Sequence, residues 1–104
     1  MNRIDNTFQQ RREADEAAFI PFVTAGDPDL DTTRRVILAA EREGADIIEL
    51  GFPFSDPIAD GPVIQASYTR VLSEGQHTED VFRMVEDLRQ DSEIPVVAMI
   101  SYSL

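Results

Sequence analysis

Residues 45–62 read ADIIELGFPFSDPIADGP, and this stretch decides how the rest of the chain is interpreted. Its apolar beginning, residues 45–50, predicts a β-strand. The following residues 52–62 are rich in proline and bounded by glycines, so they predict a loop. Pro62 suits the first turn of a helix, which we expect to run to Glu74 and to stop at Gly75. The stretch therefore predicts one strand–loop–helix unit.

Two other apolar runs lie on either side of this unit. Residues 18–25 (AFIPFVTA) end at the turn signal Gly26-Asp27-Pro28, and residues 94–100 (IPVVAMI) follow the last helical pattern. Pro21 lies within the first run and disturbs regular pairing, because proline has no N–H to donate. All three runs are apolar on both faces, which is typical of parallel strands buried under helices.

Helical patterns alternate with these strands. Residues 2–16 predict a short one-sided helix, and a second helix begins at a cap formed by Asp29 or Asp31 and stops at Gly44. We expect a further helix to be capped by Thr78. The predicted core faces consist of Val36, Ile37 and Ala40 in the second helix and Val81, Met84, Val85 and Leu88 in the last. Strands alternating with helices predict a parallel α/β sheet, whose chemistry gathers at the strands' carboxyl ends.

Composition sets further limits. The chain has 104 residues, 42% of them hydrophobic, with 20 acidic and 9 basic residues and a net charge of −11. A complete eight-stranded α/β barrel needs roughly 200 residues or more. The absence of cysteine excludes disulfides and Cys-ligated metals. No membrane span or signal peptide is recognisable, so we expect a cytoplasmic protein, and the acidic balance argues against nucleic acid or an anionic membrane as partner. All nine basic residues are arginine, and we hypothesise adaptation to high salt.

Glu49 and Asp60 are the candidate catalytic residues. Glu49 shares a strand face with Ile47, while Ile48 and Leu50 point the other way. Both faces of a parallel strand are usually covered, so we expect the Glu49 carboxyl group to be partly desolvated, which suits acid–base catalysis. A glutamate at a strand end can also simply reach water or pair with arginine. Asp60 lies on the loop beyond the same strand, where capping of the following helix is the ordinary alternative. Two acids in unlike settings can divide the roles of proton donor and acceptor.

The loop carries further candidates. Asp56, between Ser55 and Pro57, suits a turn. Apolar side chains are unusually frequent here, namely Phe52, Phe54 and Ile58, which predicts packing against another surface, or a lid, rather than a free loop. His77 is the single histidine and has no second ligand nearby, so it does not predict a metal site, and no Gly-rich phosphate cradle occurs.

Residues 49–66 (ELGFPFSDPIADGPVIQA) resemble the signature of the tryptophan synthase alpha subunit family, and residues 19–28 (FIPFVTAGDP) resemble that family's first strand and turn. The resemblance covers essentially the whole chain. It implies a (β/α)8 TIM barrel, of which residues 1–104 form the amino-terminal part of a single domain, about the first three strand–helix units. We expect a truncated form or an amino-terminal fragment.

The resemblance also implies an activity. The family is a lyase of tryptophan biosynthesis that cleaves indole-3-glycerol phosphate to indole and glyceraldehyde 3-phosphate, a retro-aldol reaction without metal or cofactor. Glu49 matches the acid–base residue that protonates the indole ring carbon, and Asp60 matches the carboxylate that holds the indole N–H. Substrate-pocket positions are matched by Phe22, Ile100 and Tyr102.

A partner is implied as well. The loop resembles the one that packs on the beta subunit, which carries pyridoxal phosphate, in an alpha2beta2 tetramer; the matching contact residues are Pro53, Asp56 and Pro57. The family's phosphate-binding loops follow the last barrel strands, so we expect little or no activity from these 104 residues alone. The alternatives are a catalytically incompetent module that only binds the beta subunit, or another phosphosugar barrel, against which the Pro-Phe-Ser-Asp-Pro segment argues.

Overall fold

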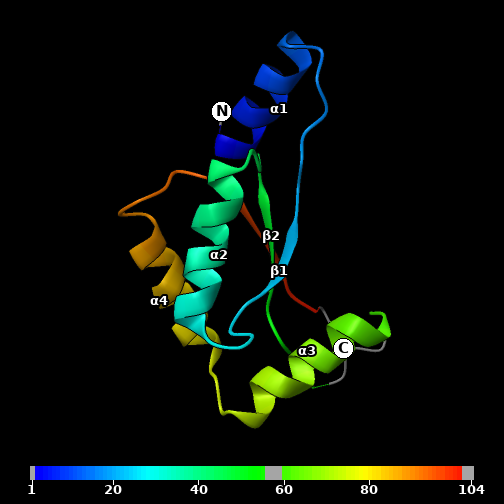
Figure 1. The fold of residues 1–104 in the computed structure, drawn as a ribbon, viewed down its shortest axis with the longest axis vertical. Helices are drawn as coiled ribbons and strands as arrows, with labels where there is room; N and C mark the ends of the chain where they lie inside the picture. Colours follow the sequence, from blue (N-terminus) through cyan, green and yellow to red (C-terminus); the bar gives the residue numbers. More distant parts are fainter. Residues whose placement is uncertain (1, 56–59, 102–104) are drawn as a thin grey trace.

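A computed structural model describes residues 2–55 and 60–101 of the chain. The elements follow in the order α1 (Arg3–Glu13), β1 (Phe22–Thr24), α2 (Leu30–Arg42), β2 (Ile48–Gly51), α3 (Pro62–Ser73), α4 (Thr78–Leu88) and β3 (Val96–Met99). The three strands form one parallel sheet in the order β1-β2-β3. Helices separate each strand from the next, as the sequence predicted (Figure 1).

The register of the sheet decides which side chains share a face. Phe22 pairs with Glu49, and Glu49 pairs with Val97, so these three side chains lie side by side on one face. Alternation along β2 sends Ile48 and Leu50 to the opposite face. Glu49 is half-buried, whereas Ile48 and Leu50 have no exposed surface.

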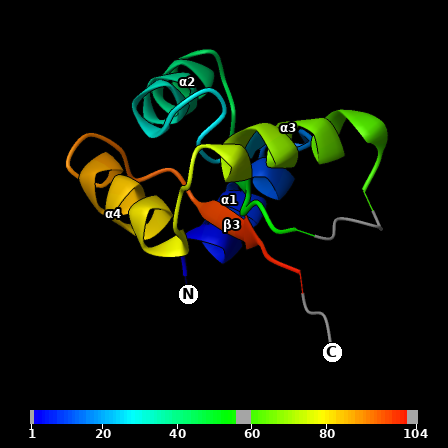
Figure 2. The ribbon, with the colours of Figure 1, turned by 90° about the horizontal axis from the view of Figure 1, so that it is seen from below.

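The hydrophobic core lies between the sheet and two helices. Helices α2 and α4 pack against each other and cover the face of Ile48 and Leu50 (Figure 2). The core residues are Ala25, Ile37, Ala45, Ile48, Leu50, Phe52, Val81, Met84, Leu88 and Ile94. The face that carries Glu49 is more open, since Val97 on it is 38% exposed.

The remaining two helices lie at opposite ends of the strands (Figure 1). Helix α1 lies at the amino ends, where Arg3 pairs with Glu93 at 2.5 Å and Arg11 approaches Asp46 at 3.8 Å. Helix α3 lies at the carboxyl end of β1, where the Ser67 and Thr24 hydroxyls are 2.8 Å apart. The residues at the sheet's carboxyl edge therefore face α3 and the loop that precedes it.

All three predicted strands are longer than the regular strands of the structure. The first run pairs irregularly before Phe22: the Phe19 and Pro21 carbonyls accept from the Asp46 and Glu49 amides at 2.9 Å. Pro21 has no N–H to return a bond, which explains why the regular strand begins after it. The predicted strand 45–50 is observed at Ile48–Gly51, and the predicted strand 94–100 at Val96–Met99.

Two predictions about the helices are wrong. The N-cap of α4 is His77, with Thr78 as the first helical residue, because the Asp80 carboxylate accepts from the His77 amide at 3.0 Å. Val36 is 45% exposed, because it lies about 100° around the helix from the fully buried Ile37. The predicted stripe on α4 is correct, and Asp29 caps α2 by accepting from the Thr32 amide at 2.7 Å.

Candidate active site

The carboxyl ends of the strands open onto a cavity of about 390 Å³. Its lining comes from the loop after β2, from α3 and from β3 with the residues that follow: Phe54, Asp60, Tyr68, Ala98, Met99, Ile100 and Ser101. This is the edge at which parallel α/β folds place their chemistry. The predicted residues Asp60 and Ile100 both lie here.

Glu49 lies on the open face of β2, two residues before the strand ends at Gly51. Its backbone amide donates to the Pro21 carbonyl at 2.9 Å, which fixes the strand against the segment before β1. Phe22 and Val97 flank its side chain on the neighbouring strands. Glu49 is thus a half-buried residue between two apolar side chains.

Asp60 does not cap the helix that follows it. The N-cap of α3 is Gly61, and no side chain bonds to the first amides of this helix. The contact that orders Asp60 involves its backbone carbonyl, which accepts from Gln65 Nε2 at 2.6 Å. The ordinary interpretation of Asp60 as a helix cap is therefore wrong, and its carboxylate is left to line the cavity.

Tyr68 is a member of this site that the sequence interpretation missed. Its side chain is 2% exposed, and its ring lies tilted against Phe54 with the centroids 5.6 Å apart. Burial raises the pKa of the Tyr68 hydroxyl, and the negative charges of Asp60 and Glu49 raise it further. The charges of both predicted carboxylates therefore act on the same phenol group. Asp60 precedes the helix, so helical spacing in the sequence gave no signal that relates Tyr68 to it.

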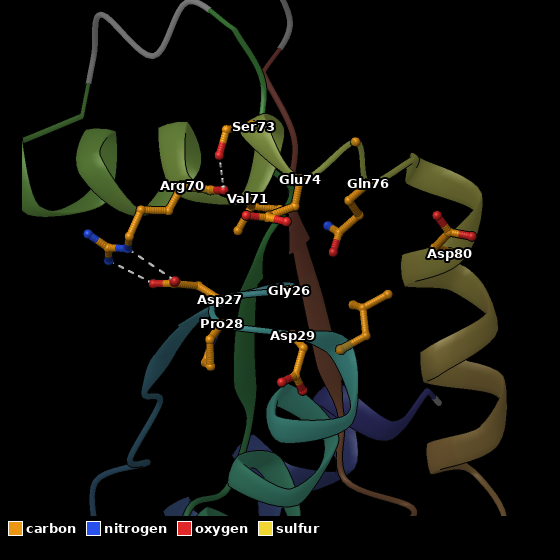
Figure 3. A pocket seen from close by; sticks show the side chains of 12 residues that line it. Gly26, Asp27, Pro28, Asp29, Arg70, Val71, Ser73, Glu74, Gln76 and Asp80 are labelled. Carbon is orange, nitrogen blue, oxygen red and sulfur yellow. Dashed lines mark hydrogen bonds and ion pairs between the residues drawn. The ribbon is translucent and has the colours of Figure 1, made fainter.

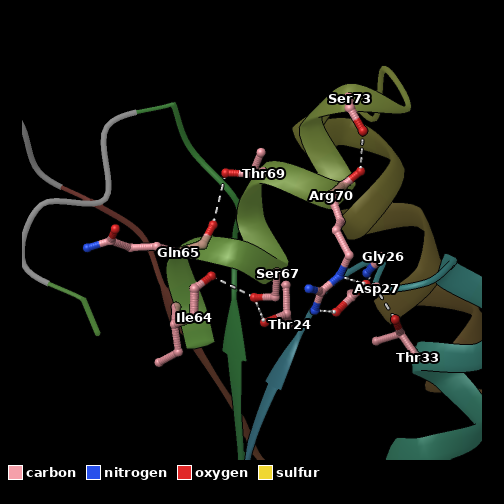
Figure 4. Close-up of polar contacts among 10 residues, drawn as sticks. All are labelled: Thr24, Gly26, Asp27, Thr33, Ile64, Gln65, Ser67, Thr69, Arg70 and Ser73. Carbon is pink, nitrogen blue, oxygen red and sulfur yellow. Dashed lines mark hydrogen bonds and ion pairs between the residues drawn. The ribbon is translucent and has the colours of Figure 1, made fainter. Parts of the chain in front are cut away.

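Three polar contacts tie α3 to the carboxyl end of β1 and the turn after it (Figure 4), and a fourth comes from Gln76, beyond the end of α3. Besides the pair of Thr24 and Ser67, Arg70 donates two hydrogen bonds to Asp27, at 3.1 and 2.8 Å. These bonds from Arg70 lower the pKa of the Asp27 carboxyl, with burial opposing and the guanidinium charge assisting. Gln76 Nε2 also donates to the Ala25 carbonyl at 3.0 Å. These contacts hold the helix that carries Tyr68.

A larger cavity, of about 580 Å³, lies between the β1–α2 loop, the end of α3 and the start of α4 (Figure 3). The side chains around it include four carboxylates, Asp27, Asp29, Glu74 and Asp80, together with Arg70. Arg70 is already paired with Asp27. None of the predicted catalytic or substrate-binding residues lines this cavity, so the smaller cavity at the strand ends is the better candidate.

The other predicted site residues are placed as follows. Phe22 is half-buried on β1, with its ring over Gly51, and Ile100 is 61% exposed at the cavity mouth. Pro53 is half-buried at the start of the loop. Tyr102, Asp56 and Pro57 lie outside the described residues.

The apolar loop residues that can be described pack within the chain itself. Phe52 is buried and contacts Phe82 of α4 with ring centroids 5.3 Å apart, and Phe54 contacts Tyr68. These two side chains therefore pack against α4 and α3 of the same chain. Within the described ranges 2–55 and 60–101, no cluster of three or more His, Cys, Asp or Glu is placed to hold a metal ion. Among the same residues, no helix has both the length and the apolar character that a membrane crossing requires.

A parallel sheet with crossover helices defines an α/β protein, a class in which functional residues gather at the carboxyl ends of the strands. Residues 8–104 match the family model described as "Tryptophan synthase alpha chain". The chain belongs to the tryptophan synthase alpha chain family.

Individual relatives agree with this assignment. The chain is 50% identical to the tryptophan synthase alpha chain of Caldanaerobacter subterraneus subsp. tengcongensis over 99% of its own length, and 53% identical to that of Synechococcus elongatus over 93%. The crystal structure of tryptophan synthase subunit alpha from Legionella pneumophila superposes with a TM-score of 0.91 at 40% identity, covering 95% of this chain and 38% of that one. The chain spans 39% and 36% of the two curated relatives. It is thus similar to one part of a TIM-barrel protein.

Proposed function

We propose that this chain supplies the acid–base part of a lyase site that cleaves indole-3-glycerol phosphate to indole and glyceraldehyde 3-phosphate. The observation that carries the proposal is the position of Asp60 in the lining of the cavity at the strand ends, beyond the strand β2 that carries Glu49 on its open face. Membership in the alpha chain family supports the same substrate.

In this reaction Glu49 delivers a proton to the indole ring carbon that bears the glycerol phosphate side chain. The Glu49 carboxylate that results then takes the proton of the hydroxyl on the adjoining side-chain carbon. The carbonyl of the aldehyde forms as the carbon–carbon bond breaks, and the electron pair of that bond returns to the ring, which leaves as indole. The Asp60 carboxylate accepts the indole N–H and stabilises the positive charge that develops on the protonated ring. The cavity's apolar lining, including Ile100, suits an aromatic ring.

The substrate's phosphate needs an anchor that is not among these residues. In α/β barrels the phosphate site is frequently formed by the loops after strands 7 and 8, and this chain corresponds to the first three strands. Positioning of a substrate lowers the activation barrier by as much as about 7–11 kcal/mol, so its loss slows the reaction strongly. We therefore expect the 104-residue chain alone to show little or no cleavage.

The activity is best tested in a complete barrel. Residues 1–101 of this chain are used to replace the corresponding part of the Legionella alpha subunit, and indole release from indole-3-glycerol phosphate is measured. Glu49→Gln and Asp60→Asn should each lower kcat at least about 100-fold, as expected for a general acid and for an electrostatic stabiliser. Glu79→Gln, an exposed change on α4, is the matched control. A folded hybrid that is inactive, or in which the site variants match the control, would contradict the proposal.

We also propose a beta subunit of tryptophan synthase, the carrier of pyridoxal phosphate, as the partner of the loop at Pro53, Asp56 and Pro57. The same loop carries Asp60 at its end, so partner binding and the catalytic carboxylate are neighbours in sequence. Calorimetric titration of the hybrid with a beta subunit tests this: Pro53→Ala should weaken binding, and Pro62→Ala, beyond the loop, should not. Binding without any lyase activity would favour the alternative of a module that only binds.

A further inference from the structure

The hydroxyl of Tyr68 is the polar group whose role the proposed reaction leaves open. Its ring is held on two sides, by Phe54 at 5.6 Å between centroids and by the end of β2. A methyl group built on Gly51 would lie 2.8 Å from Tyr68 Oη, so the oxygen reaches the strand two residues beyond Glu49. Helical side chains lean toward the helix N-terminus, which is the end where Asp60 lies. The phenol oxygen therefore lies at the carboxyl end of β2, in the part of α3 that faces this end of the sheet.

The groups around the Tyr68 hydroxyl favour its acting as a hydrogen-bond donor. The charged groups that act on it are Asp60, before α3, and Glu49, on β2. Strands β1 (Phe22–Thr24) and β3 (Val96–Met99) bring no titratable side chain to it. Burial and the two negative charges raise the pKa of Tyr68, so the phenol keeps its proton at neutral pH. Within the described ranges the hydroxyl donates to no protein group, and Tyr68 and Asp60 line the same cavity.

We propose that Tyr68 is a positioning residue for Asp60: when substrate occupies the cavity, the Tyr68 hydroxyl donates a hydrogen bond to the Asp60 carboxylate and keeps that carboxylate facing the cavity. Asp60 is the favoured acceptor because it shares the cavity lining with Tyr68, whereas Glu49 does not line it. The inference rests on the proposed function, in which Asp60 has to remain an anion to accept the indole N–H.

The composition of the chain provides a direct spectroscopic test. It holds no tryptophan and two tyrosines, Tyr68 and Tyr102. In a Tyr102→Phe background the near-ultraviolet absorbance of the phenolate reports Tyr68 alone. We expect its titration midpoint to lie above that of an ordinary tyrosine. Asp60→Asn should lower it more than Glu49→Gln does, and Asp87→Asn, on the exposed side of α4, should leave it unchanged. A midpoint that is ordinary, or that responds to Glu49 more than to Asp60, would overturn the proposal.

The catalytic test uses the hybrid barrel and separates positioning from a structural role. Tyr68→Phe keeps the ring and its packing, so the fold is retained, and kcat should fall about tenfold, the effect of losing one hydrogen bond to a charged group. In an Asp60→Asn background the same change should cause no further loss, because Tyr68 acts through Asp60. Additive losses would refute the inference. An inactive parent hybrid would refute the proposed function instead, and the phenol titration would still decide the role of Tyr68.

Discussion

Adding one methyl group at Gly51 tests the packing on which the candidate site is built. In Gly51→Ala the new Cβ would lie 2.5 Å from Phe22 Cζ and 2.9 Å from Phe22 Cε2, and 2.8 Å from Tyr68 Oη. Ordinary van der Waals contact begins at 3.4 Å, so the Phe22 ring has to retreat by about 0.9 Å. Tyr68 is 2% exposed and has little room to move. Overpacking of this kind costs about 1–3 kcal/mol.

Equilibrium urea unfolding, followed by circular dichroism, measures this cost. Each kcal/mol corresponds to about 4–8 °C in Tm for a domain of this size, so thermal unfolding gives an independent value. Phe22→Leu removes the two clashing ring atoms. The double variant Gly51→Ala/Phe22→Leu should therefore be more stable than the two single losses predict, by at least about 0.5 kcal/mol.

Gly44→Ala is the matched control for this cycle. Gly44 has a φ of +107°, and a Cβ there would touch nothing within 4 Å, so its cost comes from backbone strain alone. Combined with Phe22→Leu it should be additive. The reasoning is refuted if Gly51→Ala costs less than about 0.5 kcal/mol, or if both double variants are additive.

Three further predictions concern the core, an ion pair and the net charge. Leu88→Ala, at a position with no exposed surface, should cost about 2–5 kcal/mol in urea unfolding, whereas exposed Thr69→Ala should change little. Asp27→Asn should cost about 0.2–1 kcal/mol at pH 7. Arg70 lowers the pKa of Asp27 in the folded state, so this stabilisation is present above the unfolded-state pKa of about 3.9. It is lost as the pH falls through the lower folded-state value. The free energies of unfolding of the variant and the parent should therefore converge in acid. At a net charge of −11, Tm should rise between low salt and molar KCl, and a level or falling Tm would exclude adaptation to salt.

Features governed by short-range rules were predictable from the sequence. The parallel α/β architecture followed from three apolar runs alternating with helical patterns, and Pro62 marked the start of α3 correctly. The buried stripe of α4 followed from its spacing. The division of β2 into one face with Ile48 and Leu50 and another with Glu49 followed from period-two alternation.

Features that depend on tertiary contacts were not predictable in the same way. The sequence could not exclude a capping role for Asp60, because Gly61 and Asp60 are both acceptable N-caps. Which of them caps α3 depends on how this helix packs against the rest of the chain. Tyr68 was overlooked because an aromatic residue in a helix ordinarily indicates core. Its relation to Asp60 and Glu49 exists only once the end of β2 and the start of α3 meet. The inward packing of Phe52 and Phe54 likewise needed the positions of Phe82 and Tyr68.

Helix α3 is anchored to β1, although it follows β2 in the chain. Thr24, Asp27 and the Ala25 carbonyl hold it from a strand with which it shares no loop. The position of the helix therefore does not depend on the loop before it alone. Substitutions at positions 55–59 can alter a binding surface under selection, while α3 and the side chains that it presents stay in register with the sheet.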